Sequence, residues 1–242
     1  AAVAAVVAAV VAGAVVAGAV AGVAAGAVAG RCGKSGRAAM ASRVSDVNPH
    51  EPPDPRDRAD GTSDGPAVHL VPMRRRHLRS VMRIEAQVYP RPWSLPLFMS
   101  ELNLRSSRVY YVARVKGIVV GYCGLMLVEE DGHITNIAVD PAWHRHHIGT
   151  RLLMNAARQA AARGATRLTL EVRMSNLSAQ KLYRKFGFEP AGVRKNYYAE
   201  SREDALIMWA YGIATDDYAE RLRAIDAGLR GSTLLDEGEP GR

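Results

Sequence analysis

The order of predicted strands and helices between residues 67 and 213 constrains the fold of this chain more than any other feature. Three β-rich runs come first, at residues 109–115, 118–128 and 134–139, and Lys116-Gly117 and Asp131-Gly132 between them predict tight hairpin turns. The pattern then changes to a helix at residues 149–162, a strand at 167–172, a helix at 176–186 and two final strands at 188–193 and 205–211. An antiparallel meander followed by strand–helix–strand predicts a mixed α/β sheet flanked by helices.

Shorter elements are expected on either side of this pattern. Residues 69–71 predict a strand, residues 74–87 an amphipathic helix, and Ser94 the N-cap of a second helix that ends at Leu104. Residues 214–242 predict a short helix and then a polar tail. We therefore expect one domain at residues 67–213, with residues 214–242 outside it.

The N-terminal 66 residues differ from this domain in composition. Residues 1–30 comprise 15 Ala, 10 Val and 5 Gly. Three interpretations stay open for them: a low-complexity segment, a membrane-spanning helix that leaves the rest of the chain in the cytoplasm, or a cleaved signal peptide. Residues 31–66, rich in Pro, Asp, Arg, Gly and Ser, predict a disordered linker. Cys32 and Cys123 are too few and too far apart for a disulfide scaffold and fit a reducing compartment, so we expect a cytoplasmic protein.

Positive charge is concentrated in the expected domain. Residues 67–213 carry 22 basic and 11 acidic side chains, a net charge of +11, whereas the whole chain carries +8. Such a domain suits a polyanionic cofactor, a nucleic acid or an anionic membrane, and charge alone does not choose among them. Five arginines, Arg74, Arg75, Arg76, Arg79 and Arg83, predict a solvated helix face, with RNA contact as the alternative.

The loop before the helix at 149–162 is a candidate phosphate site. Backbone N–H groups and the positive end of a helix converge in such a loop, and Arg145 and Arg151 would add charge. An ordinary strand-to-helix turn remains the alternative. His144, His146 and His147 lie nearby without the carboxylates or cysteines usual at zinc sites, so we expect no metal there.

Three side chains farther along each allow two interpretations. Glu171 ends a strand, where it is either a general base or an exposed glutamate paired with Arg173. Tyr183 belongs to an apolar helical stripe, which indicates core packing, unless its hydroxyl faces a ligand and donates a proton. Asn176 is a helix N-cap or a ligand contact. Cys123 lies within a strand, without a histidine nearby in the sequence, and is expected to be an inert core residue.

Several segments together resemble the GNAT acetyltransferases, over most of residues 67–213. Within the family, the likeness is greatest to the enzymes that acetylate the N-terminal alanine of a ribosomal protein. The segments are Pro92-Trp93-Ser94, TNIAVDP at 135–141, the loop at 145–150, LEVR at 170–173, Asn176, AQKLYRKFGF at 179–188, Asn196-Tyr197-Tyr198 and REDA at 202–205.

The resemblance implies a GNAT fold, in which two neighbouring parallel strands, here ending at Val139 and Val172, splay apart in a mostly antiparallel sheet. It implies acetyl-CoA as co-substrate, bound in the cleft between those strands, and no metal. Glu171 matches the general base of the family and Tyr183 its general acid. The implied acetyl-CoA contacts are main-chain groups of Ile137, Ala138 and Val139, the pyrophosphate loop Arg145, His146, His147, Ile148, Gly149 and Thr150, and Asn176.

The loop departs from the family pattern, because His144 and His147 replace the usual first residue and first glycine. His147 is therefore expected either to adopt a left-handed or bridge conformation or to donate a hydrogen bond to phosphate.

The implied reaction is direct attack of a protein N-terminal α-amine on the acetyl thioester, with a strand N–H near Val139 stabilising the oxyanion. A ribosomal protein is the expected partner, and no nucleic acid is needed to explain the charge. Two alternatives remain: a small-amine acetyltransferase acting on a polyamine or antibiotic, and a non-catalytic binding module. Five acidic residues are expected either to attract a basic peptide or to be plain surface: Glu129, Glu130, Asp131, Glu203 and Asp204.

Overall fold

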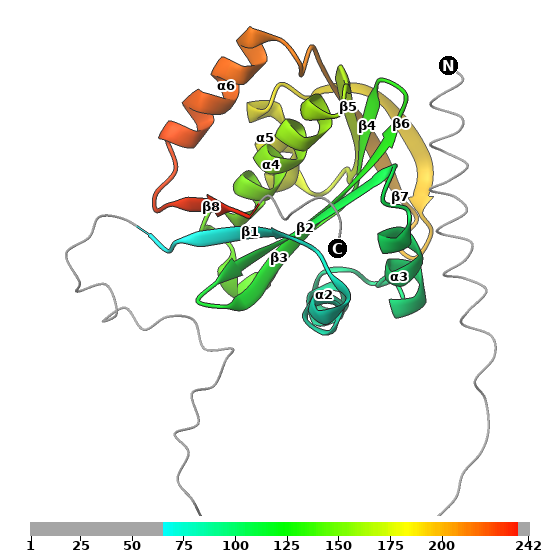
Figure 1. Cartoon of the computed structure of the whole chain (residues 1–242). Coiled ribbons are helices and arrows are strands. Elements are labelled where there is room, and N and C mark those ends of the chain that lie inside the picture. Colours follow the sequence, from blue (N-terminus) through cyan, green and yellow to red (C-terminus); the bar gives the residue numbers. More distant parts are fainter. Residues whose placement is uncertain (1–64, 237–242) are drawn as a thin grey trace, which may run out of the picture.

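The computed structural model of this protein describes residues 65–236 (Figure 1). The predictions for residues 1–30 and for nearly all of the linker at 31–66 lie outside the described residues. Among the described residues, no helix has both the length and the apolar character needed to cross a bilayer.

One mixed sheet of eight strands forms the centre of the described chain, in the order β6-β7-β5-β4-β3-β2-β1-β8. Neighbouring strands are antiparallel except in the pairs β4–β5 and β1–β8, which are parallel. This confirms the mixed, mostly antiparallel α/β sheet. The strands are β1 (Val68–Pro72), β2 (Arg108–Val115), β3 (Ile118–Val128), β4 (Asp131–Val139), β5 (Arg167–Arg173), β6 (Glu189–Tyr198), β7 (Glu203–Tyr211) and β8 (Thr233–Leu235).

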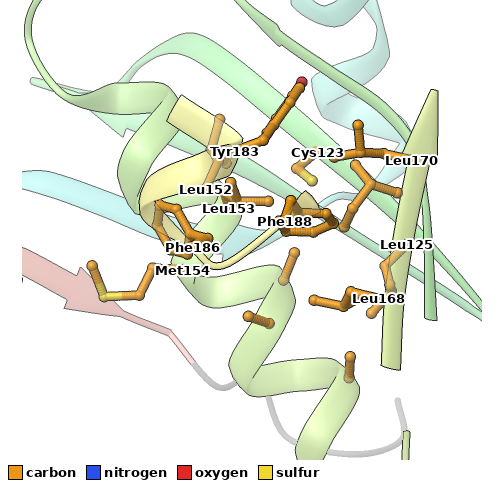
Figure 2. Close-up of a cluster of buried hydrophobic side chains, with 14 of the residues drawn as sticks. Cys123, Leu125, Leu152, Leu153, Met154, Leu168, Leu170, Tyr183, Phe186 and Phe188 are labelled. Carbon is orange, nitrogen blue, oxygen red and sulfur yellow. The ribbon is translucent and has the colours of Figure 1, made fainter. Parts of the chain in front are cut away.

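Helices cover both faces of the sheet, and each face has its own apolar core (Figure 1). On one face, α2 (Leu78–Val88) and α3 (Leu95–Asn103) bury Ile84 and Phe98 against β2 and β3. On the other, α4 (Ile148–Ala162) and α5 (Leu177–Lys185) pack on β3, β4 and β5, and Figure 2 shows part of this larger cluster. The remaining helices are two short 3-10 turns, η2 (Arg75–His77) and η3 (Pro141–Trp143), and α6 (Asp216–Ala227).

The end of α5 follows directly from its sequence. Gly187 has φ +78°, the left-handed conformation expected after a helix C-cap. The N–H of Phe188 donates to the carbonyl of Tyr183 at 3.1 Å, and the N–H of Gly187 donates to Arg184 at 3.0 Å. These two bonds define a Schellman motif, which turns Phe188 back into the core (Figure 2). The motif thereby sets where Tyr183 lies relative to the sheet.

The second turn of the meander was predicted wrongly. Lys116-Gly117 does form a turn, but the next turn is at Glu129-Glu130, and Asp131 and Gly132 already belong to β4. Asp131 is buried and pairs with Arg167 on β5, with Nε 2.6 Å from Oδ1. A Cβ on Gly132 would lie 2.7 Å from a methyl group of Leu168, so the glycine permits close packing rather than a turn.

The expected polar tail is also wrong as a description of residues 230–236, because they include β8. This strand pairs in parallel with β1, and the N–H of Asp236 donates to the carbonyl of Leu70 at 2.9 Å. Gly231 makes the approach possible, since its φ is +76° and a Cβ there would lie 2.6 Å from the carbonyl oxygen of Pro66. The preceding helix α6 buries Tyr218 and Leu222 in the larger core. Residues 214–236 are therefore packed together with the sheet.

Candidate active site

The ladder between β4 and β5 ends early, and this opening organises the site. The two strands pair only at Asp131–Arg167, Gly132–Leu168 and His133–Thr169. Beyond that point β4 continues for six residues to Val139 and β5 for four to Arg173, without pairing to each other. The parallel central strands thus separate as the resemblance implied. Glu171 lies on β5 just past the point of separation.

Backbone groups of β4 line this unpaired edge. The hydroxyl of Tyr89 donates to the carbonyl of Ile137 at 2.9 Å, and His144 Nε2 lies 3.3 Å from the carbonyl of Val139. Both carbonyls therefore face away from β3, and the N–H groups of the same two residues face that way too. Ala138 alternates with them and pairs with Tyr122 on β3. We expected a main-chain group of Ala138 to contact acetyl-CoA. This expectation needs correction, because the N–H and C=O groups of Ala138 face β3.

Glu171 is a buried carboxylate with two partners. Its Oε2 lies 2.7 Å from His133 Nε2 and its Oε1 lies 3.2 Å from a guanidinium nitrogen of Arg194, and 6% of its side chain is exposed. The alternative interpretation, an exposed glutamate paired with Arg173, is wrong. Arg173 pairs with Glu200 and Glu203 instead.

The charge state of Glu171 follows from these partners. Burial alone would raise the pKa of its carboxyl, but the hydrogen bond and charge of His133 and the charge of Arg194 outweigh burial. The net pKa lies below the ordinary value of 4.5. Glu171 is therefore ionised at neutral pH and acts as a hydrogen-bond acceptor.

Tyr183 is packed in the core, as its helical stripe predicted. Its ring is buried against Phe188, with centroids 5.9 Å apart. In Figure 2 its hydroxyl points away from the apolar cluster that holds the ring. Burial raises the pKa of Tyr183, with smaller contributions from Cys123 and Tyr198. The phenol therefore keeps its proton at neutral pH.

Tyr198, at the end of β6, links the two candidate catalytic side chains. Burial raises its pKa to about 12, and the nearby Glu171 carboxylate adds to the shift. Tyr198 in turn raises the pKa values of Tyr183 and Tyr89. The guanidinium carbon of Arg173 lies 3.9 Å from the centroid of its ring. Glu171, Tyr183 and Tyr89 are thus each electrostatically coupled to this tyrosine.

The loop at residues 145–150 has the backbone of an anion site. Arg145 has φ +71° and His147 φ +58°, so the left-handed option expected for His147 is confirmed. His147 is the N-cap of α4, and its side chain makes no capping hydrogen bond. The first N–H groups of α4, at Ile148, Gly149 and Thr150, therefore point outward at the positive end of a 15-residue helix.

Two side chains expected at the phosphate or CoA site have other hydrogen bonds. Arg151 is 2% exposed, and its guanidinium donates to Thr233 and to the carbonyls of Arg230 and Gly231, so the expected phosphate contribution from Arg151 is wrong. The side-chain oxygen of Asn176 accepts from the N–H of Ala179 at 3.1 Å and caps α5.

The structure also places the other candidates from the sequence: Cys123, the five arginines and the five acidic residues. Cys123 is buried, which raises its pKa to about 12, as expected for an inert core cysteine. Four of the five arginines form an exposed face, but Arg83 pairs with Asp140 at 2.8 Å. The five acidic residues do not gather as a free patch, because Asp131, Glu203 and Asp204 pair with Arg167, Arg173 and Lys195. Within residues 65–236 no three potential metal ligands converge.

Several site residues were missed by the sequence analysis. His133 was hidden because Asp131-Gly132 was assigned to a turn, which shortened the strand that carries it. Glu85 lies in α2 and Tyr89 is its C-cap, and the helical stripe that includes position 85 indicated only packing. Arg194 belongs to β6 and reaches Glu171 only through the pairing of β6, β7 and β5. The contacts of His133 and Arg194 with Glu171 depend on strand register rather than on a local pattern.

The separated parallel strands, the outward N–H groups at the start of α4 and the buried glutamate and tyrosine are the features expected of an acyl-CoA-dependent transferase. The model of the acetyltransferase (GNAT) family matches residues 78–188. This chain belongs to the GNAT acetyltransferase family and is an N-acetyltransferase. Acetyltransferases of this family use acetyl-CoA.

Within the family, the chain is similar to acetyltransferases that modify protein N-termini. The chain is 43% identical over 137 residues to a Bacillus subtilis protein provisionally named ribosomal protein bS18-alanine N-acetyltransferase, which covers 57% of this chain and 91% of that protein. It is 35% identical over 154 residues to the N-alpha-acetyltransferase RimI of Mycobacterium tuberculosis, covering 61% of this chain and 94% of that one. The crystal structure of the Escherichia coli ribosomal-protein-S18-alanine N-acetyltransferase superposes with a TM-score of 0.56 at 31% identity, covering 60% and 94%.

Proposed function

We propose that this protein acetylates the N-terminal α-amine of a ribosomal protein, with acetyl-CoA as the donor and alanine as the acceptor residue. The observation that carries the proposal is the unpaired edge of β4, together with the ionised Glu171 just past the point where the strands separate and the protonated Tyr183 on α5. The Bacillus subtilis and Escherichia coli relatives, similar over about nine-tenths of their length, have names that give the same acceptor and support it here. A ribosomal acceptor places the reaction in the cytoplasm.

The residues present fit acetyl-CoA. The outward N–H groups of Ile148, Gly149 and Thr150, with Arg145, would hold the pyrophosphate, and His146 and His147 would flank it. Main-chain groups of Ile137 and Val139 would hold the pantetheine and thioester. Asn176, at the start of α5, would contact the CoA arm. Acetyl-CoA, when bound, supplies the thioester whose acetyl group is transferred.

Glu171 would act on the acceptor amine. An N-terminal amine has an ordinary pKa near 8, so only a minor fraction is neutral at pH 7. An ionised carboxylate held by His133 and Arg194 is a weak base, and it would accept the proton through a water molecule. The same negative charge attracts the ammonium form of the amine to the site.

Tyr183 would act on the leaving thiolate, and β4 would act on the carbonyl oxygen of the acetyl group. The Tyr183 phenol keeps its proton at neutral pH and would donate it to the departing thiolate. An N–H of Ile137 or Val139 would stabilise the negative charge that develops on the carbonyl oxygen. No side chain has to form a covalent intermediate, so transfer would be direct in a ternary complex.

The deciding experiment incubates the full chain and acetyl-CoA with a peptide beginning Ala-Arg, and analyses the peptide by mass spectrometry. We expect a mass increase of one acetyl group at the N-terminus. An unmodified peptide under saturating enzyme, with acetylation of a free polyamine or antibiotic, would assign a small-amine enzyme instead. No turnover together with no heat of acetyl-CoA binding would assign a non-catalytic module.

A further inference from the structure

Glu85 is a buried carboxylate that the proposed reaction does not use. It lies in the last turns of α2 and is 1% exposed. Its Oε2 accepts from the N–H of Trp93 at 2.8 Å, while its Oε1 is buried without a hydrogen-bond partner among the described residues. A buried oxygen with no partner costs stability, so a role other than packing is needed to explain this glutamate.

Glu85 holds both ends of the turn that follows α2. Its backbone carbonyl accepts from the N–H of Tyr89 at 2.9 Å, and its side chain accepts from the N–H of Trp93. Pro90 and Pro92 between them have no N–H. Of the three N–H groups in residues 89–93, two therefore bond to this one residue, which fixes the shape of the turn.

The turn carries Tyr89 to the unpaired edge of β4. The hydroxyl of Tyr89 donates to the carbonyl of Ile137 at 2.9 Å, which is one of the main-chain groups assigned to acetyl-CoA. Burial raises the pKa of Tyr89, and Glu85, Tyr183 and Tyr198 contribute to the shift in that order. Tyr89 thus contacts the unpaired edge of β4, and the turn that carries it is bonded to Glu85 at both ends.

We propose that Glu85 is a positioning residue for acetyl transfer, which clamps the turn at residues 89–93 so that the Tyr89 hydroxyl stays on the Ile137 carbonyl. This inference rests on the proposed function. Glu85 acts through Tyr89 and need not touch either substrate. Its charge state sets the strength of the clamp, because an ionised carboxylate accepts a hydrogen bond more strongly than a neutral acid.

Glu85 forms no ion pair with any residue in the described part of the chain. Burial raises the pKa of its carboxyl to about 7, and the Trp93 N–H partly opposes the shift. The titratable group beside it is Tyr89. Nearby charged groups pair with each other, Arg83 with Asp140 and Glu101 on α3 with Arg108, and β3 has no charged side chain. The clamp therefore changes strength near neutral pH.

The test compares Glu85→Ala and Glu85→Gln with the unchanged full chain, measuring kcat and KM on the Ala-Arg peptide from pH 6 to 8. Glu85→Ala should lower kcat/KM about tenfold at pH 8, because the Trp93 N–H loses its acceptor. Glu85→Gln keeps an acceptor that does not titrate. The ratio of wild-type to Glu85→Gln kcat should therefore rise from about 1 at pH 6 to about 3 at pH 8.

Two further variants separate positioning from general destabilisation. Glu101→Gln alters a second buried glutamate on the same sheet face and should leave the pH profile unchanged. In a Tyr89→Phe background, Glu85→Ala should cost much less than tenfold, because both substitutions act through one hydroxyl. A Glu85→Ala loss that is equal with and without that hydroxyl would overturn the inference, as would kcat/KM within twofold of wild type.

Failure of the proposed function gives a different result. If the wild-type chain binds acetyl-CoA but acetylates no peptide, the proposed acceptor is wrong. The effect of Glu85 on the turn is then tested by measuring acetyl-CoA affinity by calorimetry. Glu85→Ala should weaken that affinity about tenfold, again only when the Tyr89 hydroxyl is present. Unchanged affinity would overturn the inference in this case.

Discussion

His133 Nε2 lies 2.7 Å from Glu171 Oε2, and this bond joins β4 to β5 directly beyond their last backbone pair, His133–Thr169. Both side chains are buried, at 2% and 6% exposure. A side-chain bond thus takes over where the backbone ladder stops, and it holds the candidate base at the point where the strands separate.

Replacing His133 should change the acid limb of the activity profile. His133→Phe removes a hydrogen bond that lowers the pKa of Glu171 and leaves burial, which raises it. The pH below which activity is lost should therefore move upward. A pH series of kcat/KM on the Ala-Arg peptide measures this, and an unchanged acid limb would contradict the assignment of the bond.

Glu171→Gln and Tyr183→Phe should each lower kcat strongly. Loss of a general acid or base costs roughly 100- to 10,000-fold. Tyr183→Phe keeps the ring that packs on Phe188, so the fold should persist. Tyr211→Phe, at an exposed position on β7, is the matched control. Single-turnover mass spectrometry gives the rates, and full turnover in both site variants would refute their roles.

His147→Gly should stabilise the loop before α4. The left-handed conformation of His147 costs roughly 1 kcal/mol that glycine would not pay. Glycine loses more conformational entropy on folding, which offsets part of this gain. We expect a gain of up to about 1 kcal/mol in the free energy of unfolding, and tighter acetyl-CoA binding by calorimetry. His146→Gly is the control for the stability measurement, since His146 has no positive φ and packs on Trp143. Weaker binding by His147→Gly would instead indicate a direct phosphate contact.

The buried guanidinium of Arg151 should make the C-terminal segment essential to stability. Ending the chain at Leu229 removes Arg230, Gly231 and Thr233 and leaves a buried cation without these acceptors, a loss of several kcal/mol. Arg151→Met in the shortened chain should recover part of that loss, although it destabilises the full chain. Urea unfolding of the four proteins tests this, and additive effects would show that Arg151 and the segment are independent.

Stability should fall as pH rises toward neutrality because of Glu85. The folded-state pKa is raised from 4.5 to about 7, so the folded protein holds this proton more tightly than the unfolded chain between those values. The contribution is fully present below pH 4.5 and is lost above 7, a change of up to about 3 kcal/mol. Urea unfolding at pH 5 and pH 8 should show it in wild type and not in Glu85→Gln.

Local patterns predicted most elements of the fold, because helix period, strand alternation and the cap at Gly187 are properties of neighbouring residues. The Asp131-Gly132 turn was wrong because contacts of these residues with Arg167 and Leu168, distant in sequence, override a local turn signal. β8 was missed because a three-residue strand has too little pattern to recognise.

The candidate site was predicted by resemblance more than by residue pattern. Taken alone, the sequence around Glu171 and Tyr183 favoured an exposed ion pair and core packing. The partners that set their chemistry, His133, Arg194 and Tyr198, come from three other places in the chain and meet them only through strand register. No spacing in the sequence encodes those distances.

The parallel pairing of β8 with β1 also limits self-association of the protein through the edge of its sheet. β1 lies near the end of the sheet, and without β8 its outer N–H and C=O groups would form an open edge that can pair with another molecule. β8 replaces that edge with a strand only three residues long, which is a poor template for aggregation. A chain cut short by protease at Leu229 would therefore be prone to self-association even where it stayed folded.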